Sequence, residues 1–273
     1  MEPHAARIVL GAQIVTLLAH DPAPARPRYA RPMPENDVSA AYSRRAREYA
    51  DALGRIDATS RADRDTIAAW SLACAGPVLD LGCGPGHWTG YLDGLGVEVC
   101  GVDPSRALIE IARAEHPGVG FSVGTAAALP PGGAAGVLAW YSLIHVPPEA
   151  LSEELTAVRR ILRPGGRLLL GFFAGDEVAP FDHAVTTAWT WTPAWITDRL
   201  AEAGLVVERL RQRQDPGARE HGEVWAVLAE KALPGDGGAA GGGGVRPGRP
   251  GGLPVLGQGQ VQDRRHAWPL AAP

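Results

Sequence analysis

The amino-acid sequence predicts an α/β fold with a mostly parallel sheet and an antiparallel strand near the carboxyl end of the chain. Between residues 37 and 203, short apolar runs alternate with helix-like segments, which is typical of successive strand–helix–strand units. An apolar strand that begins at residue 78 opens into a turn with three glycines at alternate positions. Two closing strands are joined by the turn-like sequence Asp215-Pro216-Gly217, and such a hairpin adds an antiparallel strand to a parallel sheet.

Glycine and proline mark the ends of several expected elements. Gly76-Pro77 ends the second helix, Pro147 begins a later one, Gly204 ends the last, and the turn 163–166 leads into a strand. The expected helices are 37–52, 62–74, 87–95, 105–115, 147–162 and 193–203. The expected strands are 78–81, 97–102, 119–123, 136–142, 167–173, 205–210 and 223–229.

The composition favours one domain that handles a small molecule. A chain of 273 residues and 28.7 kDa is long enough for one ample α/β domain and two tails. Its net charge of −4 and pI near 6.1 give no general attraction for nucleic acid or for an anionic membrane. The three cysteines have neither metal-binding nor disulfide spacing, so we expect no metal site and a reducing, cytoplasmic location.

The sequence divides into three parts. We expect residues 1–35 to be an N-terminal extension with a proline-rich linker at 20–36, residues 36–231 to be the folded domain, and residues 232–273 to be a disordered Gly/Pro-rich tail. The apolar stretch 8–19 is shorter than the roughly twenty residues of a membrane-spanning helix. An acidic residue before it and the prolines after it argue against a secretory signal. We expect an appended strand or helix there, or a wrongly assigned start codon.

The turn after the first parallel strand is suited to a positively charged ligand. Gly82, Gly84 and Gly86 permit positive φ and leave no Cβ between the main chain and a ligand. Glycine loops that bind phosphate aim amide N–H groups at negative charge, and Asp80, just before the first glycine, opposes that arrangement. The carboxylate of Asp80 therefore favours an ammonium or sulfonium group.

A second carboxylate follows at the end of the next strand. Asp103 lies about twenty residues beyond the first glycine, where the ribose of a bound nucleotide is expected. A carboxylate there accepts hydrogen bonds from the 2′ and 3′ hydroxyls of an adenosine, whether in NAD or in an adenosyl sulfonium. The structural alternative is a tight turn with two incidental acids.

With these motifs the chain resembles the class I S-adenosylmethionine-dependent methyltransferases, particularly the small-molecule groups known as methyltransferase types 11 and 25. The resemblance extends over residues 37–231 and rests on the segments 78–86 (VLDLGCGPG), 101–105 (GVDPS) and 162–168 (LRPGGRL). It implies a doubly wound, seven-stranded sheet in the order 3-2-1-4-5-7-6, with an antiparallel C-terminal strand. It also implies that S-adenosyl-L-methionine binds at the carboxyl ends of the first, second and fourth strands.

The resemblance assigns roles to individual positions. Asp80 and the backbone of Gly82 would face the methionine moiety, while Tyr42 and Tyr49 either reach its carboxylate or pack a helix on the core. Many relatives carry an acidic residue where this chain has Gly124-Thr125-Ala126, so recognition of adenine falls to Thr125 or to the backbone. The expected cofactor-binding residues are Tyr42, Tyr49, Asp80, Gly82, Cys83, Gly84, Gly86, Asp103, Pro104, Ser105, Thr125, Ala126 and Tyr141.

Two histidines are the expected catalytic residues. Methyl transfer from a sulfonium is an in-line displacement for which positioning can suffice, so a general base is optional. His145 follows the fourth strand and either accepts a proton from the acceptor or merely caps a neighbouring element. His183, with Asp182 as its candidate orienting group, lies in a segment that the family uses as a lid or substrate wall. The tryptophans of this segment either line a substrate pocket or cover the edge of the sheet: Trp189, Trp191 and Trp195.

The leading hypothesis is transfer of a methyl group to a small-molecule acceptor, with neither nucleic acid nor membrane as a partner. A non-catalytic protein that binds S-adenosylmethionine would keep the same turn. An NAD-dependent oxidoreductase is the third hypothesis, and it is disfavoured by Asp80 and by the spacing of the three glycines.

Overall fold

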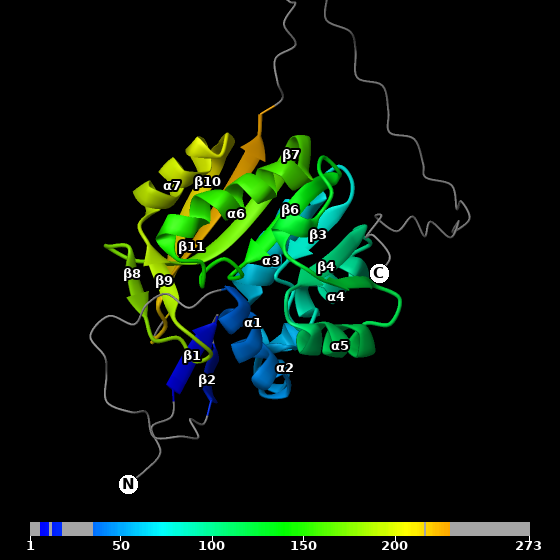
Figure 1. Ribbon diagram of the computed structural model, residues 1–273, viewed down its shortest axis with the longest axis vertical. Coiled ribbons are helices and arrows are strands. Elements are labelled where there is room, and N and C mark those ends of the chain that lie inside the picture. The colour runs from blue at the N-terminus through cyan, green and yellow to red at the C-terminus, as the bar shows by residue number, and fades with distance from the viewer. Residues whose placement is uncertain (1–5, 11–12, 18–34, 216, 230–273) are drawn as a thin grey trace, which may run out of the picture.

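A central sheet covered by helices on both faces forms the body of the protein in the computed structural model (Figure 1). The structure describes residues 6–10, 13–17, 35–215 and 217–229. The predicted linker 20–36, apart from its last two residues, lies outside the described residues, as does the predicted tail 232–273. Those last two residues, Glu35 and Asn36, begin a helix instead.

Helices and strands alternate along most of the described chain. The helices are α1 (Glu35–Arg44), α2 (Ala46–Leu53), α3 (Arg61–Leu72), α4 (His87–Gly94), α5 (Arg106–Glu115), α6 (Pro148–Ile161) and α7 (Pro193–Glu202). The strands are β1 (Ala6–Leu10), β2 (Gln13–Leu17), β3 (Val78–Leu81), β4 (Val99–Asp103), β5 (Gly120–Val123), β6 (Ala134–Trp140), β7 (Leu162–Ala174), β8 (Ala179–Phe181), β9 (Ala188–Trp191), β10 (Leu205–Gln214) and β11 (Glu220–Leu228).

The order of the main strands confirms the predicted order. They lie side by side as β5-β4-β3-β6-β7-β11-β10, which is 3-2-1-4-5-7-6 in the predicted numbering. The strands from β5 to β7 pair in parallel, and β11 pairs antiparallel with both β7 and β10, as the closing hairpin predicts. The order reverses between β3 and β6, and doubly wound sheets bind ligands at the carboxyl ends of the strands beside such a point.

The predicted number of strands is wrong, because the sheet has nine strands within the described residues rather than seven. The two additional strands, β8 and β9, lie in the segment for which the sequence predicts a lid or substrate wall. β9 pairs in parallel with Phe173 and Ala174 at the end of β7, and β8 pairs antiparallel with β9. At three and four residues, these strands are too short for an alternating pattern to show in the sequence.

Local backbone geometry changes other expected elements. The single helix expected at 37–52 is divided into α1 and α2 at Arg45, which has φ of −114° and ψ of 17°. β7 extends back to Leu162 and includes the predicted turn, where Gly165 has φ of 71°. β1 and β2 pair antiparallel, in the stretch for which the sequence predicts a strand or helix. No helix among the described residues is long and apolar enough to cross a membrane.

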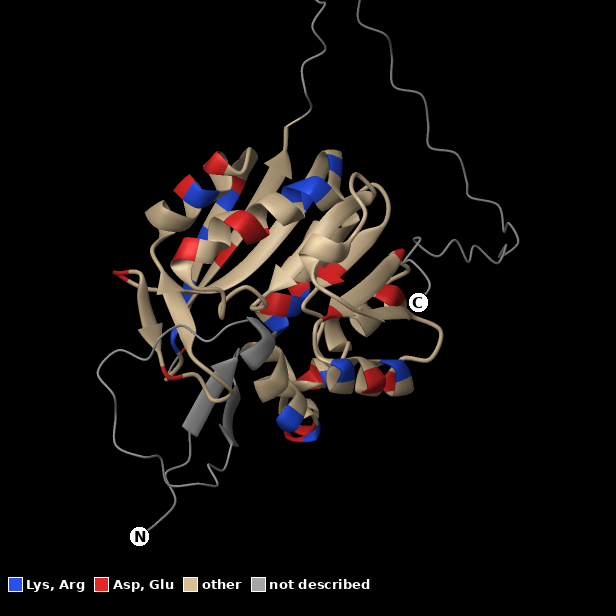
Figure 2. Ribbon diagram, viewed as in Figure 1, with Lys and Arg blue, Asp and Glu red and all other residues tan. Residues whose placement is uncertain are grey.

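Two apolar layers, one on each face of the sheet, hold the helices in place. On one face, Leu155 of α6 and Ile196 of α7 are buried against β6 and β7. On the other face, Trp70 of α3 and Leu92 of α4 pack with Leu138. Many of the charged residues lie on the outer helices (Figure 2). The buried layers fix the sheet, and with it the loops at the carboxyl ends of β3, β4 and β6.

The close approach of α3 to the sheet depends on a glycine. A Cβ at Gly136 of β6 would lie 2.6 Å from Sγ of Cys74 and 3.0 Å from Cη2 of Trp70. We expect Gly136→Ala to lower the free energy of unfolding by about 1–3 kcal/mol because the methyl overpacks a buried layer. At Gly94 of α4 no heavy atom lies within 4 Å of an added Cβ. The control Gly94→Ala should therefore gain up to about 1 kcal/mol. Urea denaturation tests both, and equal stability of the two variants would contradict this packing.

Candidate functional site

The glycine turn lies at the carboxyl end of β3, and its backbone requires glycine. Gly82 and Gly86 have φ of 71° and 86°, in the left-handed region. A Cβ on Gly82 would lie 2.3 Å from the Cβ of Ser142, and one on Gly86 would lie 2.8 Å from the ring of Phe121. The neighbouring chain can come this close only because the two side chains are absent.

Asp103, the last residue of β4, holds the glycine turn in place. Its Oδ2 accepts a hydrogen bond from the backbone N–H of Gly84 at 3.0 Å, and its Oδ1 accepts one from the N–H of Ser105 at 2.8 Å. The side chain is 8% exposed. Burial raises the pKa of Asp103 to about 6, although the two backbone hydrogen bonds act in the opposite direction. Asp103, the residue predicted to bind the ribose, therefore also holds the glycine turn in place.

A pair of serines ties the first helix to this region. Ser105 caps α5, since its Oγ accepts a hydrogen bond from the N–H of Leu108. The same oxygen lies 2.8 Å from Oγ of Ser43 on α1. Helix α1 is therefore attached beside Asp103, although the two serines are far apart in the sequence.

Asp80 is buried at the end of β3. Its side chain is 2% exposed, and its Oδ2 accepts a hydrogen bond from Oγ1 of Thr89 on α4 at 2.7 Å. Burial raises the pKa of Asp80 to about 7 despite that hydrogen bond, and the nearby Asp103 adds to the increase. A cation placed beside Asp80 would compensate the buried charge, which is the role that the sequence predicts for it.

A pocket with an empty volume of about 620 Å³ opens over the glycine turn. It brings together residues from β3, the turn, α2, α3 and the end of β6. Six of the predicted cofactor residues line it: Tyr49, Asp80, Gly82, Cys83, Gly84 and Tyr141. The remaining wall includes residues that the sequence analysis does not single out: Leu53, Ala58, Thr59, Asp63, Pro85, His87, Trp88 and Trp140.

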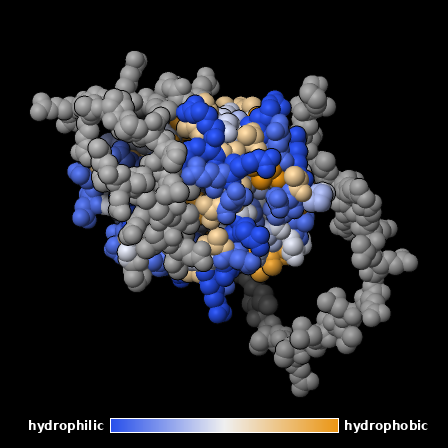
Figure 3. All heavy atoms as spheres, turned by 90° about the horizontal axis from the view of Figure 1, so that it is seen from below, coloured by the Kyte–Doolittle hydropathy of each residue, from blue (hydrophilic) through white to orange (hydrophobic). Residues whose placement is uncertain are grey.

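The other predicted cofactor residues are not among those that line this pocket: Tyr42, Gly86, Asp103, Pro104, Ser105, Thr125 and Ala126. Ser105 is fully buried as a helix cap, and Pro104 beside it is exposed. Thr125 precedes the short 3-10 helix Ala126–Ala128, whose Ala126 is buried in the main apolar cluster. Gly86 ends the turn and is the N-cap of α4. On the side of the molecule where α1 and α2 lie, the described surface is mainly hydrophilic with small hydrophobic patches (Figure 3).

His145 is held in one tautomer by its two partners. Its Nδ1 lies 2.7 Å from the carbonyl oxygen of Thr187, which can only accept, so Nδ1 carries the ring proton. Its Nε2 lies 2.8 Å from the hydroxyl of Tyr42 and accepts a hydrogen bond from it. Burial lowers the pKa of His145 to about 4, with the Thr187 hydrogen bond opposing. Tyr42 thus binds His145, an arrangement that neither of the two predicted roles of Tyr42 includes.

His183, the other predicted catalytic residue, lies against His145. The two rings meet edge to face with centroids 5.2 Å apart. Both ring nitrogens of His183 are buried with no hydrogen-bond partner among the described residues, so the predicted orienting bond from Asp182 is absent. The pKa of His183 is lowered to about 3, mainly by burial and in smaller part by the charges of His145 and Arg219. Both histidines are therefore neutral over the physiological pH range.

The tryptophans of this segment pack on the sheet. Trp191 is fully buried and stacks on Phe172 of β7 with ring centroids 5.7 Å apart. Trp189 and Trp195 pack against the same apolar cluster. Neither described pocket is lined by these three residues. Their packing agrees with the structural one of the two predicted roles.

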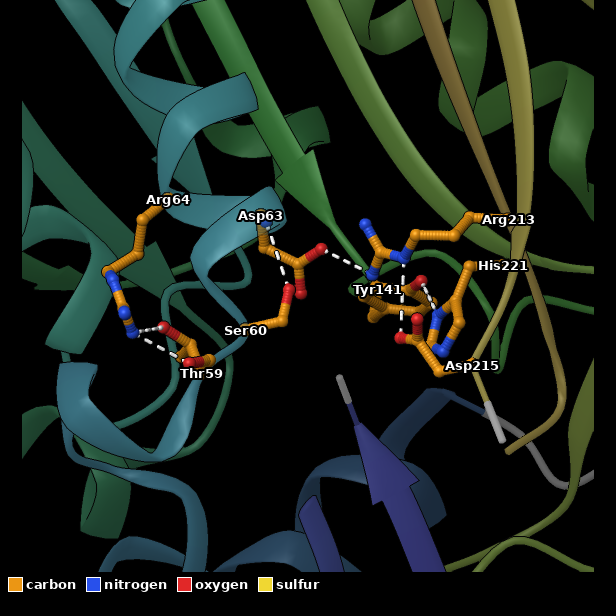
Figure 4. Close-up of polar contacts among 8 residues, drawn as sticks. All are labelled: Thr59, Ser60, Asp63, Arg64, Tyr141, Arg213, Asp215 and His221. Carbon is orange, nitrogen blue, oxygen red and sulfur yellow. Dashed lines mark hydrogen bonds and ion pairs between the residues drawn. The ribbon is translucent and has the colours of Figure 1, made fainter. Parts of the chain in front are cut away.

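A polar cluster that the sequence analysis missed lies beside the pocket (Figure 4). Arg213 of β10 binds Asp63 of α3 at 2.7 Å and Asp215 at 3.3 Å. The hydroxyl of Tyr141 makes a hydrogen bond with Nδ1 of His221 on β11. Tyr141 has φ of 55°, unusual for a residue other than glycine, which directs its ring to this cluster. No sequence signal could have found it, because its members come together only through the hairpin.

Comparison with known proteins identifies the central part of the chain. Residues 78–166, which contain the glycine turn, Asp103 and His145, match the family described as methyltransferase domain. These residues are thus similar to known methyltransferase domains. The fold is that of the class I S-adenosylmethionine-dependent methyltransferases, as the resemblance predicts.

Individual proteins similar to this chain carry methyltransferase names. A malonyl-[acyl-carrier protein] O-methyltransferase of Erwinia billingiae is 29% identical over 153 residues, covering 56% of this chain and 58% of that protein. An uncharacterized methyltransferase of Mycobacterium bovis is 39% identical over 111 residues, covering 40% of this chain and 44% of that protein. The chain thus spans about half the length of the curated relatives it matches.

Solved structures share the fold of this chain. The 1,6-didemethyltoxoflavin-N1-methyltransferase of Burkholderia thailandensis, solved with 1,6-didemethyltoxoflavin and S-adenosylhomocysteine, has a TM-score of 0.60 at 22% identity. That similarity covers 76% of this chain and 95% of the solved chain. A methyltransferase of Leishmania major has a TM-score of 0.58 at 16% identity, covering 70% of this chain and 82% of the solved one.

The carboxyl of Asp80 should make the stability of the folded protein depend on pH. Its pKa is about 7 in the folded protein against an ordinary value of 3.8. Between these two pH values the folded state therefore binds more protons at Asp80 than the unfolded state does. The contribution of Asp80 to stability is complete at low pH and is lost as the pH rises through 7. We expect Asp80→Asn to gain stability relative to the wild type between about pH 5 and about pH 8.

Thermal melts of the protein without added ligand measure this difference. The exposed Asp93 on α4 provides the control variant, Asp93→Asn, which should follow the wild type at every pH. A stability difference between Asp80→Asn and the wild type that stays constant with pH would contradict the assignment.

Proposed function

We propose that this protein binds S-adenosylmethionine and transfers its methyl group to a small-molecule acceptor. The observation that carries the proposal is the pair of buried carboxylates, Asp80 and Asp103, on either side of the glycine turn at the switch point of the sheet. The match of residues 78–166 to the methyltransferase family supports it.

The residues around the turn fit this cofactor. Asp80 offers a buried negative charge to the ammonium group of the methionine end. Each oxygen of Asp103 accepts one backbone hydrogen bond and has a further lone pair for a ribose hydroxyl. Oγ of Ser142 and Nδ1 of His87 are buried beside the turn without a hydrogen-bond partner among the described residues. A long ligand with polar groups would supply partners for both atoms.

The cofactor supplies a methyl group that is already activated as a sulfonium. The chain therefore has to bind and orient the cofactor and the acceptor, and to accept a proton. His145 is neutral, and its hydrogen bond to Thr187 leaves Nε2 as the basic nitrogen. Burial raises the pKa of Tyr42 well above its usual value, so its phenol stays protonated and donates to Nε2. We assign to His145 the proton that the acceptor releases, which Nε2 takes once the hydroxyl of Tyr42 turns aside. His183 packs against the His145 ring and adds no charge.

Two other functions are distinguishable from this one. The name of the Erwinia billingiae relative states an acyl-carrier protein substrate for that enzyme, which makes a carrier-linked acceptor the second candidate. A protein that only binds the cofactor would form no methylated product. We further propose that residues 36–231 are the functional unit and that the protein works in the cytoplasm, where its three free cysteines stay reduced.

Binding of S-adenosylhomocysteine tests the cofactor assignment. We expect Asp103→Asn to raise its dissociation constant by about 10- to 100-fold, because a hydrogen bond to a charged group contributes about 1.5–3 kcal/mol. Isothermal titration calorimetry measures the change. The control is Asp93→Asn, at an exposed carboxylate on α4, which should bind like the wild type. Wild-type affinity in a folded Asp103→Asn variant would count against the ribose contact.

Transfer of a labelled methyl group tests the role of His145. The acceptor is found by incubating the protein with labelled S-adenosylmethionine and a fractionated metabolite extract. With that acceptor, we expect His145→Gln to lower kcat by about 10²- to 10⁴-fold, as is typical for loss of a general base. The affinity for S-adenosylhomocysteine should not change. Since the pKa of His145 is about 4, wild-type kcat should be independent of this group above about pH 5. An unchanged kcat in the variant would leave His145 a purely structural residue.

A further inference from the structure

A second pocket adjoins the cofactor pocket and has no role in the function proposed so far. Its empty volume is about 610 Å³. Asp63, Trp140 and Tyr141 line both pockets, so the two share a wall. Helix α3 contributes Asp63 and Thr66 on one side, and the β10–β11 hairpin forms the other side. We call this second pocket the α3 groove.

The register of the hairpin sets which side chains meet in the α3 groove. Across the β10–β11 ladder, Arg211 lies opposite Glu223 and Arg213 lies opposite His221, and all four line the groove. In the next strand, Gly171 of β7 lies opposite Glu223. A Cβ on Gly171 would be 2.8 Å from Cε3 of Trp140, so the indole lies flat over the missing side chain. The groove therefore has a flat aromatic surface next to polar groups.

Two buried polar atoms in the α3 groove have no hydrogen-bond partner among the described residues. Glu223 is 8% exposed, and its Oε1 accepts no hydrogen bond from the described residues. His221 is 4% exposed, and its Nε2 is likewise unpartnered within the described part of the chain. Leaving such buried atoms unpaired is unfavourable, and a ligand with matching groups would supply their partners.

The groove also contains an arginine that forms no ion pair with the described residues. Arg213 is occupied by Asp63 and Asp215 (Figure 4). Arg211 makes no ion pair with any described residue, although it lies opposite Glu223. The hydroxyl of Tyr141 makes a hydrogen bond with Nδ1 of His221, and we assign the shared proton to the phenol, which leaves the ring proton of His221 on Nε2. With this assignment, Oε1 of Glu223 is an acceptor without a partner among the described residues, and Arg211 and Nε2 of His221 are donors that can face a ligand.

We propose that the α3 groove binds the methyl acceptor and that this acceptor is a flat, uncharged ring with an N–H group next to a carbonyl, as in a cyclic amide or imide. The proposal rests on the proposed function. An N–H other than the atom that is methylated donates to Oε1 of Glu223 as a binding contact, the carbonyl oxygens accept from Arg211 and His221, and the ring lies on Trp140. An anionic acceptor is disfavoured because its carboxylate would lie beside the carboxylates of Glu223 and Asp63.

The test uses uracil as the probe, and 1,3-dimethyluracil as the matched ligand that lacks the N–H. Binding to protein saturated with S-adenosylhomocysteine is followed by saturation-transfer NMR. We expect uracil to bind at least about tenfold more tightly than its dimethyl analogue, because the buried acceptor stays unpaired with the analogue. Glu223→Met keeps the length of the side chain and removes the acceptor, and should abolish this preference. Glu202→Met, at an exposed site on α7, is the control.

Each outcome decides the proposal. Equal binding of the two pyrimidines, an unchanged preference in a folded Glu223→Met variant, or tighter binding of 4-hydroxybenzoate than of uracil would overturn it. Calorimetry with S-adenosylhomocysteine is done first, because failure of this step would overturn the proposed function instead. In that case the uracil titration without S-adenosylhomocysteine still decides whether the groove recognises the ring.

Discussion

The hydrogen bond from the backbone of Gly84 to the carboxylate of Asp103 is the contact on which the rest of the site depends. It joins the turn after β3 to the end of β4, two strands that pair in parallel. The turn can reach Asp103 because glycine adopts its left-handed backbone without strain. Through Ser105, the same carboxylate also fixes the start of α5, to which α1 is attached. One buried acid thereby positions the glycine turn and the start of α5.

Burial determines the charge state of the site. Asp80 and Asp103 are acids with raised pKa values, and His145 and His183 are bases with lowered ones. Each of these shifts has desolvation as its largest cause, and each makes the charged form costly without a ligand. A cationic ligand is therefore attracted to the acids, while the histidines stay neutral and able to accept a proton. The free energy that this arrangement costs the folded protein is offset by the apolar layers on both faces of the sheet.

The shared wall of the two pockets links recognition of the cofactor to recognition of the acceptor. Tyr141 follows β6 in a strained conformation, and its hydroxyl is bound to His221 of the closing hairpin. The antiparallel hairpin adds more than an edge to the sheet, since its register places Arg211 and Glu223 beside Trp140. Variation in this hairpin would change the acceptor while leaving the cofactor turn intact.

The sequence by itself determined the α/β fold class and the cofactor turn, because these follow from local periodicity and from glycines whose φ angles no other residue adopts easily. The strand order came from the resemblance to a known family and not from any local pattern. It also singled out Asp80, Asp103 and His145. Only the tertiary structure decided the partners of these residues: Tyr42 for His145, and Gly84 for Asp103. The sequence also did not predict the α3 groove or the strands β8 and β9. Contacts between distant segments depend on the register and packing of the whole sheet, and no local pattern of residues encodes them.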